Sequence, residues 1–257
     1  MQAQPGPPLN ILPDTFWDVF VPYSALHIFA VAICGLVIAG LALAARALPA
    51  RREAILRRAL GIFGLFYWLS YNVWWNRHGI VFANGLPLQI CDVNGVIAPL
   101  VLLTQRRFMR ATLYYWAFAL STQAFIQPAL QVGAANPIFY WFWAQHTIIL
   151  AYAVYDLAVL RFQPQWRDLM RCYAVSALYL AVVVPLNFSL GADYGYLGNL
   201  PAEAIPPFVA ALGPWPARAV VLVVLCVLAC AIVQLPWLVR RQVGGWLTVR
   251  RQMTKPS

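Results

Sequence analysis

The chain has 257 residues, of which 62% are hydrophobic and 10% are charged, and its 18 basic and 8 acidic residues give a net charge of +10. Its apolar stretches are long enough to cross a bilayer as helices, at about 1.5 Å per residue, which excludes a water-soluble globular domain. The positive charge therefore indicates membrane topology and not a nucleic-acid partner.

Seven apolar stretches follow one another and predict an all-α fold, a polytopic membrane helix bundle that forms one domain over residues 1–257. The expected transmembrane helices are 21–45, 58–76, 86–104, 110–127, 138–160, 169–189 and 216–239. Residues 1–20 lack the pattern of a cleavable signal peptide, so the first helix is expected to be a retained anchor. Glycines and prolines in 190–215 predict an external loop that can cap a site.

Basic side chains occupy alternate connections between these helices. Of the 18 basic residues, only Arg77 and Arg218 lie outside the first, third and fifth connections and the C-terminal tail. Because basic loops remain in the cytoplasm, this pattern predicts an external N-terminus and a cytoplasmic C-terminus. An odd number of helices is consistent with that orientation.

The start of the third helix, Leu86 to Gly95, holds a thiol, a carboxylate and two amides within a few residues. Ionisable groups inside a bilayer cost several kcal/mol and normally face the bundle interior or a wet cavity, so they mark candidate sites. Cys91 is expected roughly 8 Å below the outer surface, and His146 of the fifth helix roughly 12 Å below it. The two side chains therefore lie at compatible depths.

Polar side chains from other helices are expected in the same outer half of the membrane and predict a pocket that opens outward. The inner half offers little beyond Asp156 and boundary arginines. We expect the pocket and the loop above it to bind substrate through Gln89, Asn94, Asn72, Asn76, Gln123, Asn187 and Tyr194.

The chemistry of such a pocket would centre on Cys91. A thiolate attacks acyl carbonyls, and an imidazole such as His146 can take the thiol proton and later protonate a leaving group. Asp92 is the candidate that orients His146, and the amides of Gln89, Asn94 or Gln123 are candidates for oxyanion donors. The same polar residues can equally hold helices together, at about 0.6 to 2 kcal/mol per hydrogen bond, without catalysis.

Other ligand classes lack a signal in the sequence. The His, Cys and carboxylate residues show no tight metal-ligand spacing, and there is no phosphate-binding glycine loop or dinucleotide fingerprint. We therefore expect no metal and no cofactor. Membrane lipids are the expected partners, with no nucleic acid and no soluble protein partner inferred.

Four segments, in this order and spacing, resemble the bacterial YwaF family, which is related to vertebrate transmembrane protein 164. They are Leu86-Pro87-Leu88-Gln89-Ile90-Cys91-Asp92, Phe142-Trp143-Ala144-Gln145-His146, Gly191-Ala192-Asp193-Tyr194-Gly195-Tyr196-Leu197 and Leu212-Gly213-Pro214-Trp215-Pro216. The vertebrate relative is a cysteine-dependent acyltransferase that moves fatty acyl chains onto ether lysophospholipids, but its substrates do not carry over to bacterial members. For this chain the resemblance implies Cys91 as nucleophile and His146 as its histidine, in a bacterial cytoplasmic membrane. The chain departs from the family pattern at Ala192-Asp193, where Thr-Asn is expected.

The sequence is therefore consistent with two functions. The first is a membrane-embedded acyltransferase that acts on phospholipid or lysophospholipid acyl chains through a thioester on Cys91. The second is a non-enzymatic transporter or sensor in which Asp92, His146 and Asp156 bind a proton or a small polar solute. The position of Asp156 discriminates between them, because only a relay needs it on the same cavity wall as Asp92.

Overall fold

The structure, a computed structural model, describes residues 17–253, with side chains described up to Arg240. Its long helices are α1 (Ala25–Arg46), α2 (Ala50–Trp75), α3 (Ile90–Thr104), α4 (Arg107–Tyr115), α6 (Pro137–Ala158), α7 (Trp166–Leu190) and α9 (Ala217–Met253). Short elements are the π-helix η1 (Trp116–Ser121), α5 (Gln123–Ile126), α8 (Pro207–Ala210) and the 3-10 turns η2 (Tyr194–Tyr196) and η3 (Ala202–Ala204). Within the described residues there is no strand, so the all-α class is confirmed. The basic side chains beyond Arg240, including Lys255, lie outside the described part.

A helix occupies each of the seven predicted ranges, but several boundaries differ. α2 starts at Ala50, eight residues before the predicted start at 58. The prediction began too late because the first two turns of α2 carry several arginines, which interrupt the apolar pattern. α3 starts at Ile90 instead of 86, since Pro87 disfavours a helical residue before it and Gln89 is the extended N-cap. The fourth range is divided into α4, η1 and α5.

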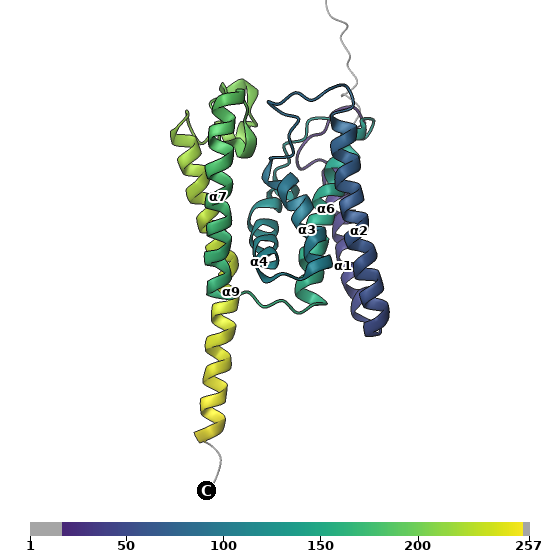
Figure 1. Ribbon diagram of the computed structural model, residues 1–257, viewed down its shortest axis with the longest axis vertical. Coiled ribbons are helices and arrows are strands. Elements are labelled where there is room, and N and C mark those ends of the chain that lie inside the picture. The colour runs from purple at the N-terminus through teal and green to yellow at the C-terminus, as the bar shows by residue number, and fades with distance from the viewer. Residues whose placement is uncertain (1–16, 254–257) are drawn as a thin grey trace, which may run out of the picture.

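Three helices in the described part are long and apolar enough to cross a membrane. They are α1, α7 and the Ala217–Arg240 part of α9, while α3 is apolar but shorter. Successive long helices run in opposite directions, so that the α1–α2 and α6–α7 connections lie at the lower end in Figure 1 and the loops 76–89 and 191–216 lie at the upper end.

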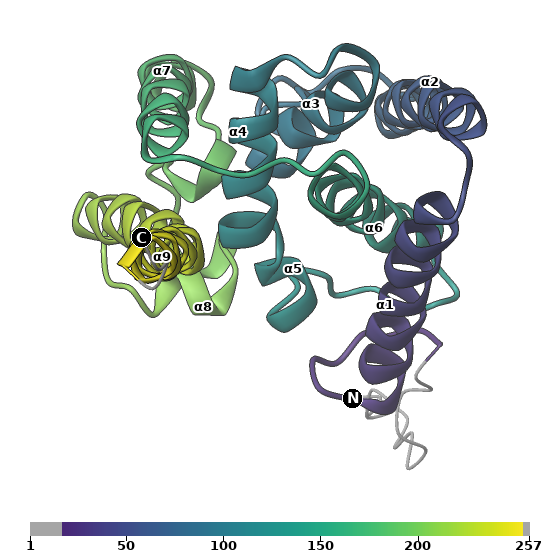
Figure 2. The ribbon, with the colours of Figure 1, turned by 90° about the horizontal axis from the view of Figure 1, so that it is seen from below.

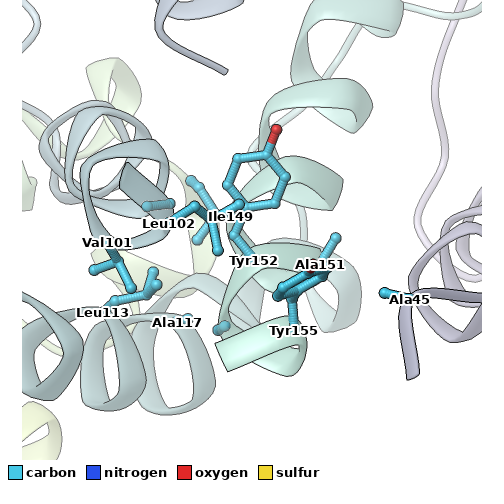
Figure 3. Close-up of a cluster of buried hydrophobic side chains, with 11 residues drawn as sticks. Ala45, Val101, Leu102, Leu113, Ala117, Ile149, Ala151, Tyr152 and Tyr155 are labelled. Atoms are coloured by element: carbon cyan, nitrogen blue, oxygen red, sulfur yellow. The ribbon is translucent and has the colours of Figure 1, made fainter. Parts of the chain in front are cut away.

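The centre of the bundle is made by α3, α4 and α6. α3 packs against α2 and α6, α6 packs against α1, and α4 packs against α7. Seen from below, α4 separates the α7–α9 side from the side that holds α1, α2 and α6 (Figure 2). Figure 3 shows the apolar cluster between them, with Val101 and Leu102 from α3, Leu113 from α4, and Ile149 and Tyr152 from α6.

Two glycines allow α2 to approach this centre closely. A Cβ on Gly61 would lie 2.6 Å from Leu103 Cγ, and one on Gly64 would lie 2.9 Å from a ring carbon of Tyr152. Small residues at helix contacts are the usual way in which membrane helices pack tightly. The α2 contact with α3 and α6 therefore depends on these positions.

Buried carboxylates at the lower end of the bundle are paired with arginines. Asp168 is fully buried and accepts from Arg107 Nη2 at 2.6 Å and from Arg171 Nη1 at 2.7 Å. Asp156, at the end of α6, accepts from Arg110 Nε at 3.0 Å. These pairs neutralise the carboxylates at the end of the bundle that carries the basic connections.

Candidate functional site

The first turn of α3 presents Cys91 and Asp92 at the upper end of the bundle. The chain turns at Leu86 and Pro87, where the Leu88 amide donates to the Leu86 carbonyl, and Gln89 is the extended N-cap, so Cys91 is the second helical residue and Asp92 the third. An acidic residue such as Asp92 in a first turn interacts favourably with the helix dipole. The thiol of Cys91 is half-buried.

Ser121 lies directly beside this thiol. The Cys91 Sγ and Ser121 Oγ atoms are 3.7 Å apart, and Asn94 Nδ2 donates to the same hydroxyl at 3.3 Å. Ser121 ends the π-helix η1, which widens the helix by one residue per turn, and such π segments are frequent at functional sites. The arrangement places a hydroxyl where it can donate to a thiolate on Cys91.

Asp92 is held by side chains of two neighbouring helices. Gln145 of α6 donates from Nε2 to Asp92 Oδ1 at 2.9 Å and to the Cys91 carbonyl at 3.2 Å. Trp68 of α2 donates from its indole to the Asp92 carbonyl at 2.9 Å. A Cβ on Gly95 would lie 3.0 Å from the Trp68 ring, so the glycine allows this close approach. The first turn of α3 is thus fixed from both sides.

His146 follows Gln145 on α6 but points to a different neighbour. Its Nδ1 is 2.7 Å from the Phe142 carbonyl, and its ring packs on Phe142 with the centroids 4.3 Å apart. Because a carbonyl only accepts, Nδ1 carries the proton and Nε2 is left with a lone pair. Among the described side chains, no hydrogen bond joins His146 to Cys91 or to Asp92. The structure therefore brings Cys91 and Asp92 to Ser121 and Gln145, and places His146 one residue further along α6.

A cavity of about 480 Å³ opens beside this turn, between the upper loops. Its lining comes from the end of α2, the 76–89 loop, the first turn of α3 and the 191–206 loop: Tyr71, Asn72, Trp75, Ala83, Asn84, Gly85, Leu86, Gln89, Asp92, Gly191, Asp193, Tyr196, Leu200, Ala204 and Pro206. Asp92, the chain neighbour of Cys91, is part of this lining, whereas Cys91 and His146 are not. The cavity wall therefore reaches the neighbourhood of the thiol.

Two of the predicted binding residues other than Asp92 line this cavity. Asn72 lines it while its amide donates to the Trp68 carbonyl at 2.8 Å. Gln89 donates to the Asp193 carbonyl at 3.2 Å and accepts from the Gly195 amide at 2.8 Å. Gln89 thereby attaches the 190–215 loop to the start of α3, so both ends of its amide are already used.

The remaining predicted binding residues do not line the cavity. The buried Asn187 side chain accepts from the Tyr194 backbone N–H at 2.8 Å and donates to the Tyr194 carbonyl at 2.9 Å. Asn76 donates to the Gly85 carbonyl at 2.9 Å. The Tyr194 hydroxyl donates to the Phe82 carbonyl at 2.7 Å. Asn94 is buried against Ser121, and Gln123 is exposed on α5. These side chains mostly fix the loops that form the cavity.

Asp193 contributes a second carboxylate to the cavity from the 190–215 loop. Its Oδ1 accepts from the Gly198 amide at 2.7 Å. Burial raises the pKa of Asp193, and the Gly198 amide and the positive charge of Arg218 only partly oppose this effect. The charged form of Asp193 is therefore poorly stabilised by the protein alone.

A sequence model of the TMEM164 family matches residues 22–234, which is most of the chain. The chain belongs to the TMEM164 family. It is a membrane protein of that family, as its apolar helices also indicate. No curated protein and no solved structure shows significant similarity to it.

Several side chains of this TMEM164-family site were not predicted. Ser121 and Gln145 are single polar residues inside apolar helices, and only the packing of η1 and α6 against α3 shows their roles. Tyr71 and Tyr196 resemble ordinary interfacial aromatics in the sequence. Within the described residues, no group of three His, Cys, Asp or Glu side chains is placed to hold a metal ion.

Proposed function

We propose that this chain is a membrane-embedded acyltransferase that moves acyl chains between phospholipids through a thioester on Cys91. The observation that carries the proposal is the position of Cys91 in the first turn of α3, 3.7 Å from Ser121 Oγ and one residue before Asp92, which lines a cavity of about 480 Å³. A cavity of this size can take a lipid ester while the acyl tail remains among the exposed apolar side chains of the bundle.

The first half-reaction forms the thioester. The Cys91 thiolate attacks the ester carbonyl carbon of the donor lipid, and the carbon–oxygen bond to glycerol breaks as the carbon–sulfur bond forms. The amides of Ile90 and Cys91 have no acceptor one turn earlier in α3, so they can donate to the developing oxyanion. This assignment replaces the side-chain amides of Gln89, Asn94 and Gln123, which are bonded elsewhere or exposed.

His146 serves as the base and acid of this scheme. Its Nε2 carries the lone pair and accepts the thiol proton, directly or through one water, then returns that proton to the departing glycerol oxygen. In the second half-reaction the hydroxyl of a lysophospholipid loses its proton to Nε2 and attacks the thioester, which regenerates the thiol. Asp92 is a positioning residue, since its carboxylate holds Gln145, the chain neighbour of His146.

The position of Asp156 weighs against a proton or solute relay. Its carboxylate is paired with Arg110 at the opposite end of the bundle, and it is not among the residues that line the cavity with Asp92. A relay across the membrane through Asp92, His146 and Asp156 would need an unpaired carboxylate on that path. The acyltransferase is therefore the better supported of the two functions.

The topology that goes with this function is a bundle of seven transmembrane helices in a bacterial cytoplasmic membrane. The N-terminus would be external and the C-terminus cytoplasmic, because the arginine-bearing connections gather at one end of the helices. In this orientation the cavity opens toward the outer leaflet. Cysteine labelling with a membrane-impermeant reagent, at a single cysteine introduced at Asn84 or Arg167, tests the orientation.

A transfer assay tests the function. Purified protein is mixed with a phospholipid donor and an isotope-labelled lysophospholipid, and labelled diacyl product is measured for the wild type, Cys91→Ser and His146→Ala. Both variants should lose product formation, whereas Cys226→Ser, which changes a half-buried cysteine of α9 away from the cavity, should retain it. Full transfer by folded Cys91→Ser protein would exclude the thioester.

A further inference from the structure

The cavity walls combine negative charge with aromatic surface. Asp92 and Asp193 supply two carboxylates, and Tyr71, Trp75 and Tyr196 supply three aromatic rings. None of the described residues that line the cavity is basic. Carboxylates attract a cation, and aromatic faces attract the weakly hydrated surface of an organic ammonium group more than that of a small metal ion.

Neither carboxylate has a cation of its own. The ion pairs within 4.0 Å that join described residues of the helices involve Glu53, Asp156 and Asp168, and neither Asp92 nor Asp193 takes part in them. The hydrogen bonds of their Oδ1 atoms come from neutral groups, the Gln145 amide and the Gly198 backbone. The negative charge of these two carboxylates is not neutralised by a neighbouring side chain, and a bound cation would neutralise it.

Arg218 does not fill this role, although it influences Asp193 electrostatically. Its side chain is buried at the start of α9 and donates to the Gly198 and Leu200 carbonyls at 2.7 and 3.2 Å. Arg218 is not part of the cavity lining. Its guanidinium therefore fixes the loop, and the face of Asp193 toward the cavity remains available for a ligand.

We propose that this cavity binds the organic ammonium group of a zwitterionic phospholipid headgroup. Asp193 and Asp92 provide the counter-charge, and the rings of Tyr71 and Tyr196 pack against the substituents of the nitrogen. An anionic headgroup such as glycerol phosphate would instead be repelled by the two carboxylates, because all these groups are negatively charged. The site therefore selects lipids with a choline or ethanolamine headgroup over anionic lipids.

This inference rests on the proposed function, because it identifies the cavity as the place where the donor or acceptor lipid is held. Asp92 lines the cavity and directly follows Cys91 in the first turn of α3, so the headgroup position lies close to the thiol. A headgroup bound at Asp193 leaves the glycerol esters of the same lipid on the Cys91 side of the cavity.

Binding is measured apart from chemistry, in full-length Cys91→Ala protein that cannot form the thioester. Native mass spectrometry or calorimetry in detergent compares short-chain phosphatidylcholine with short-chain phosphatidylglycerol of the same acyl composition. The choline lipid should bind at least about tenfold more tightly, which corresponds to about 1.4 kcal/mol. Asp193→Asn keeps the acceptor for Gly198 and should abolish most of this preference.

Two further variants separate charge and ring effects from loss of structure. Glu203→Gln is the matched control, because it removes the same charge from an exposed residue of the same loop that does not line the cavity. It should leave the preference unchanged. Tyr196→Phe should retain binding of the choline lipid, whereas Tyr196→Leu should weaken it severalfold because the aromatic face is lost.

Choline chloride in the same assay identifies the source of the ammonium group. Weak binding of choline beside tight binding of the choline lipid supports the headgroup assignment. Choline that binds as tightly as the lipid would overturn it in favour of a free ammonium compound, and equal binding of the two lipids would overturn the cation site altogether. Selective binding without transfer in the active protein would count against the enzyme and not against this site.

Discussion

Replacing Gly95 by alanine tests whether the site depends on the contact of α3 with α2 and α6. The added Cβ would lie 3.0 Å from the Trp68 ring and 3.5 Å from Gln145 Nε2, so the indole must move by a few tenths of an ångström or more. That movement lengthens the 2.9 Å bond from Trp68 to the Asp92 carbonyl and disturbs the Gln145 bonds to Asp92 and Cys91.

The expected size of the effect follows from a matched control. Gly40 lies in the middle of α1, and a Cβ there meets nothing within 4 Å. Both substitutions should gain about 0.5 to 1 kcal/mol of stability from the higher helix propensity of alanine. The difference in stability between Gly95→Ala and Gly40→Ala therefore reports the cost of overpacking at Gly95, which is typically about 1 to 3 kcal/mol. Because misplacement of a reacting group by about 1 Å can cost about 100-fold in rate, Gly95→Ala should lose more transfer activity than stability.

The assay is thermal unfolding in detergent together with the lipid transfer rate. Gly95→Ala should unfold at a lower temperature than Gly40→Ala and should transfer acyl chains at least about tenfold more slowly. If the two alanine variants were equally stable and equally active, the first turn of α3 would not be held by Trp68 and Gln145 in the way described above.

Three other substitutions follow from the same contacts. Ser121→Ala should reduce both the transfer rate and the rate at which maleimide modifies Cys91 by about tenfold, because one charge-assisted hydrogen bond to the thiolate is lost. The unfolding temperature should change little. An unchanged maleimide rate would contradict the role of the hydroxyl. Arg110→Met should destabilise the fold by about 3 to 5 kcal/mol, because Asp156 is left buried and unpaired. The double variant Arg110→Met with Asp156→Leu should recover most of this stability. Unfolding in denaturant measures both effects. Burial raises the pKa of Asp193, so the folded state binds its proton more strongly than the unfolded state does and stability should fall as the pH rises from about 4 through the folded pKa. Asp193→Asn should remove that pH dependence in a comparison of unfolding temperatures, and an identical profile in both proteins would refute it.

The helix positions could be predicted because apolar stretches of this length have few alternatives in a membrane. The helices α1, α6 and α7 begin and end close to the predicted ranges. The π-helix η1 could not be predicted, because Trp116 to Ser121 carries no glycine or proline that marks a change of helix type. Tertiary packing of η1 against α3, α6 and α9 determines its form.

The candidate site was predictable only in part. Cys91 and Asp92 stood out because ionisable groups are rare in apolar helices, and Gln89 and Asn72, which were expected in the outer half of the membrane, line the cavity. The partner of Asp92 could not be deduced, since successive residues of α6 differ by about 100° in direction and the sequence does not show whether Gln145 or His146 faces α3. The loop walls of the cavity, such as Asn84 and Ala204, carry no chemical signal of their own.

In the proposed reaction Cys91 carries the acyl group between the two lipids. Purified protein is incubated with phospholipid, and intact-mass and peptide mass spectrometry then search for an acyl adduct that hydroxylamine removes. We expect such an adduct on Cys91, absent from Cys91→Ser protein, strongly reduced in His146→Ala protein and retained in Cys226→Ser protein. Folded wild-type protein that forms no adduct with any of a varied set of donor lipids, or an adduct confined to another cysteine, would contradict it.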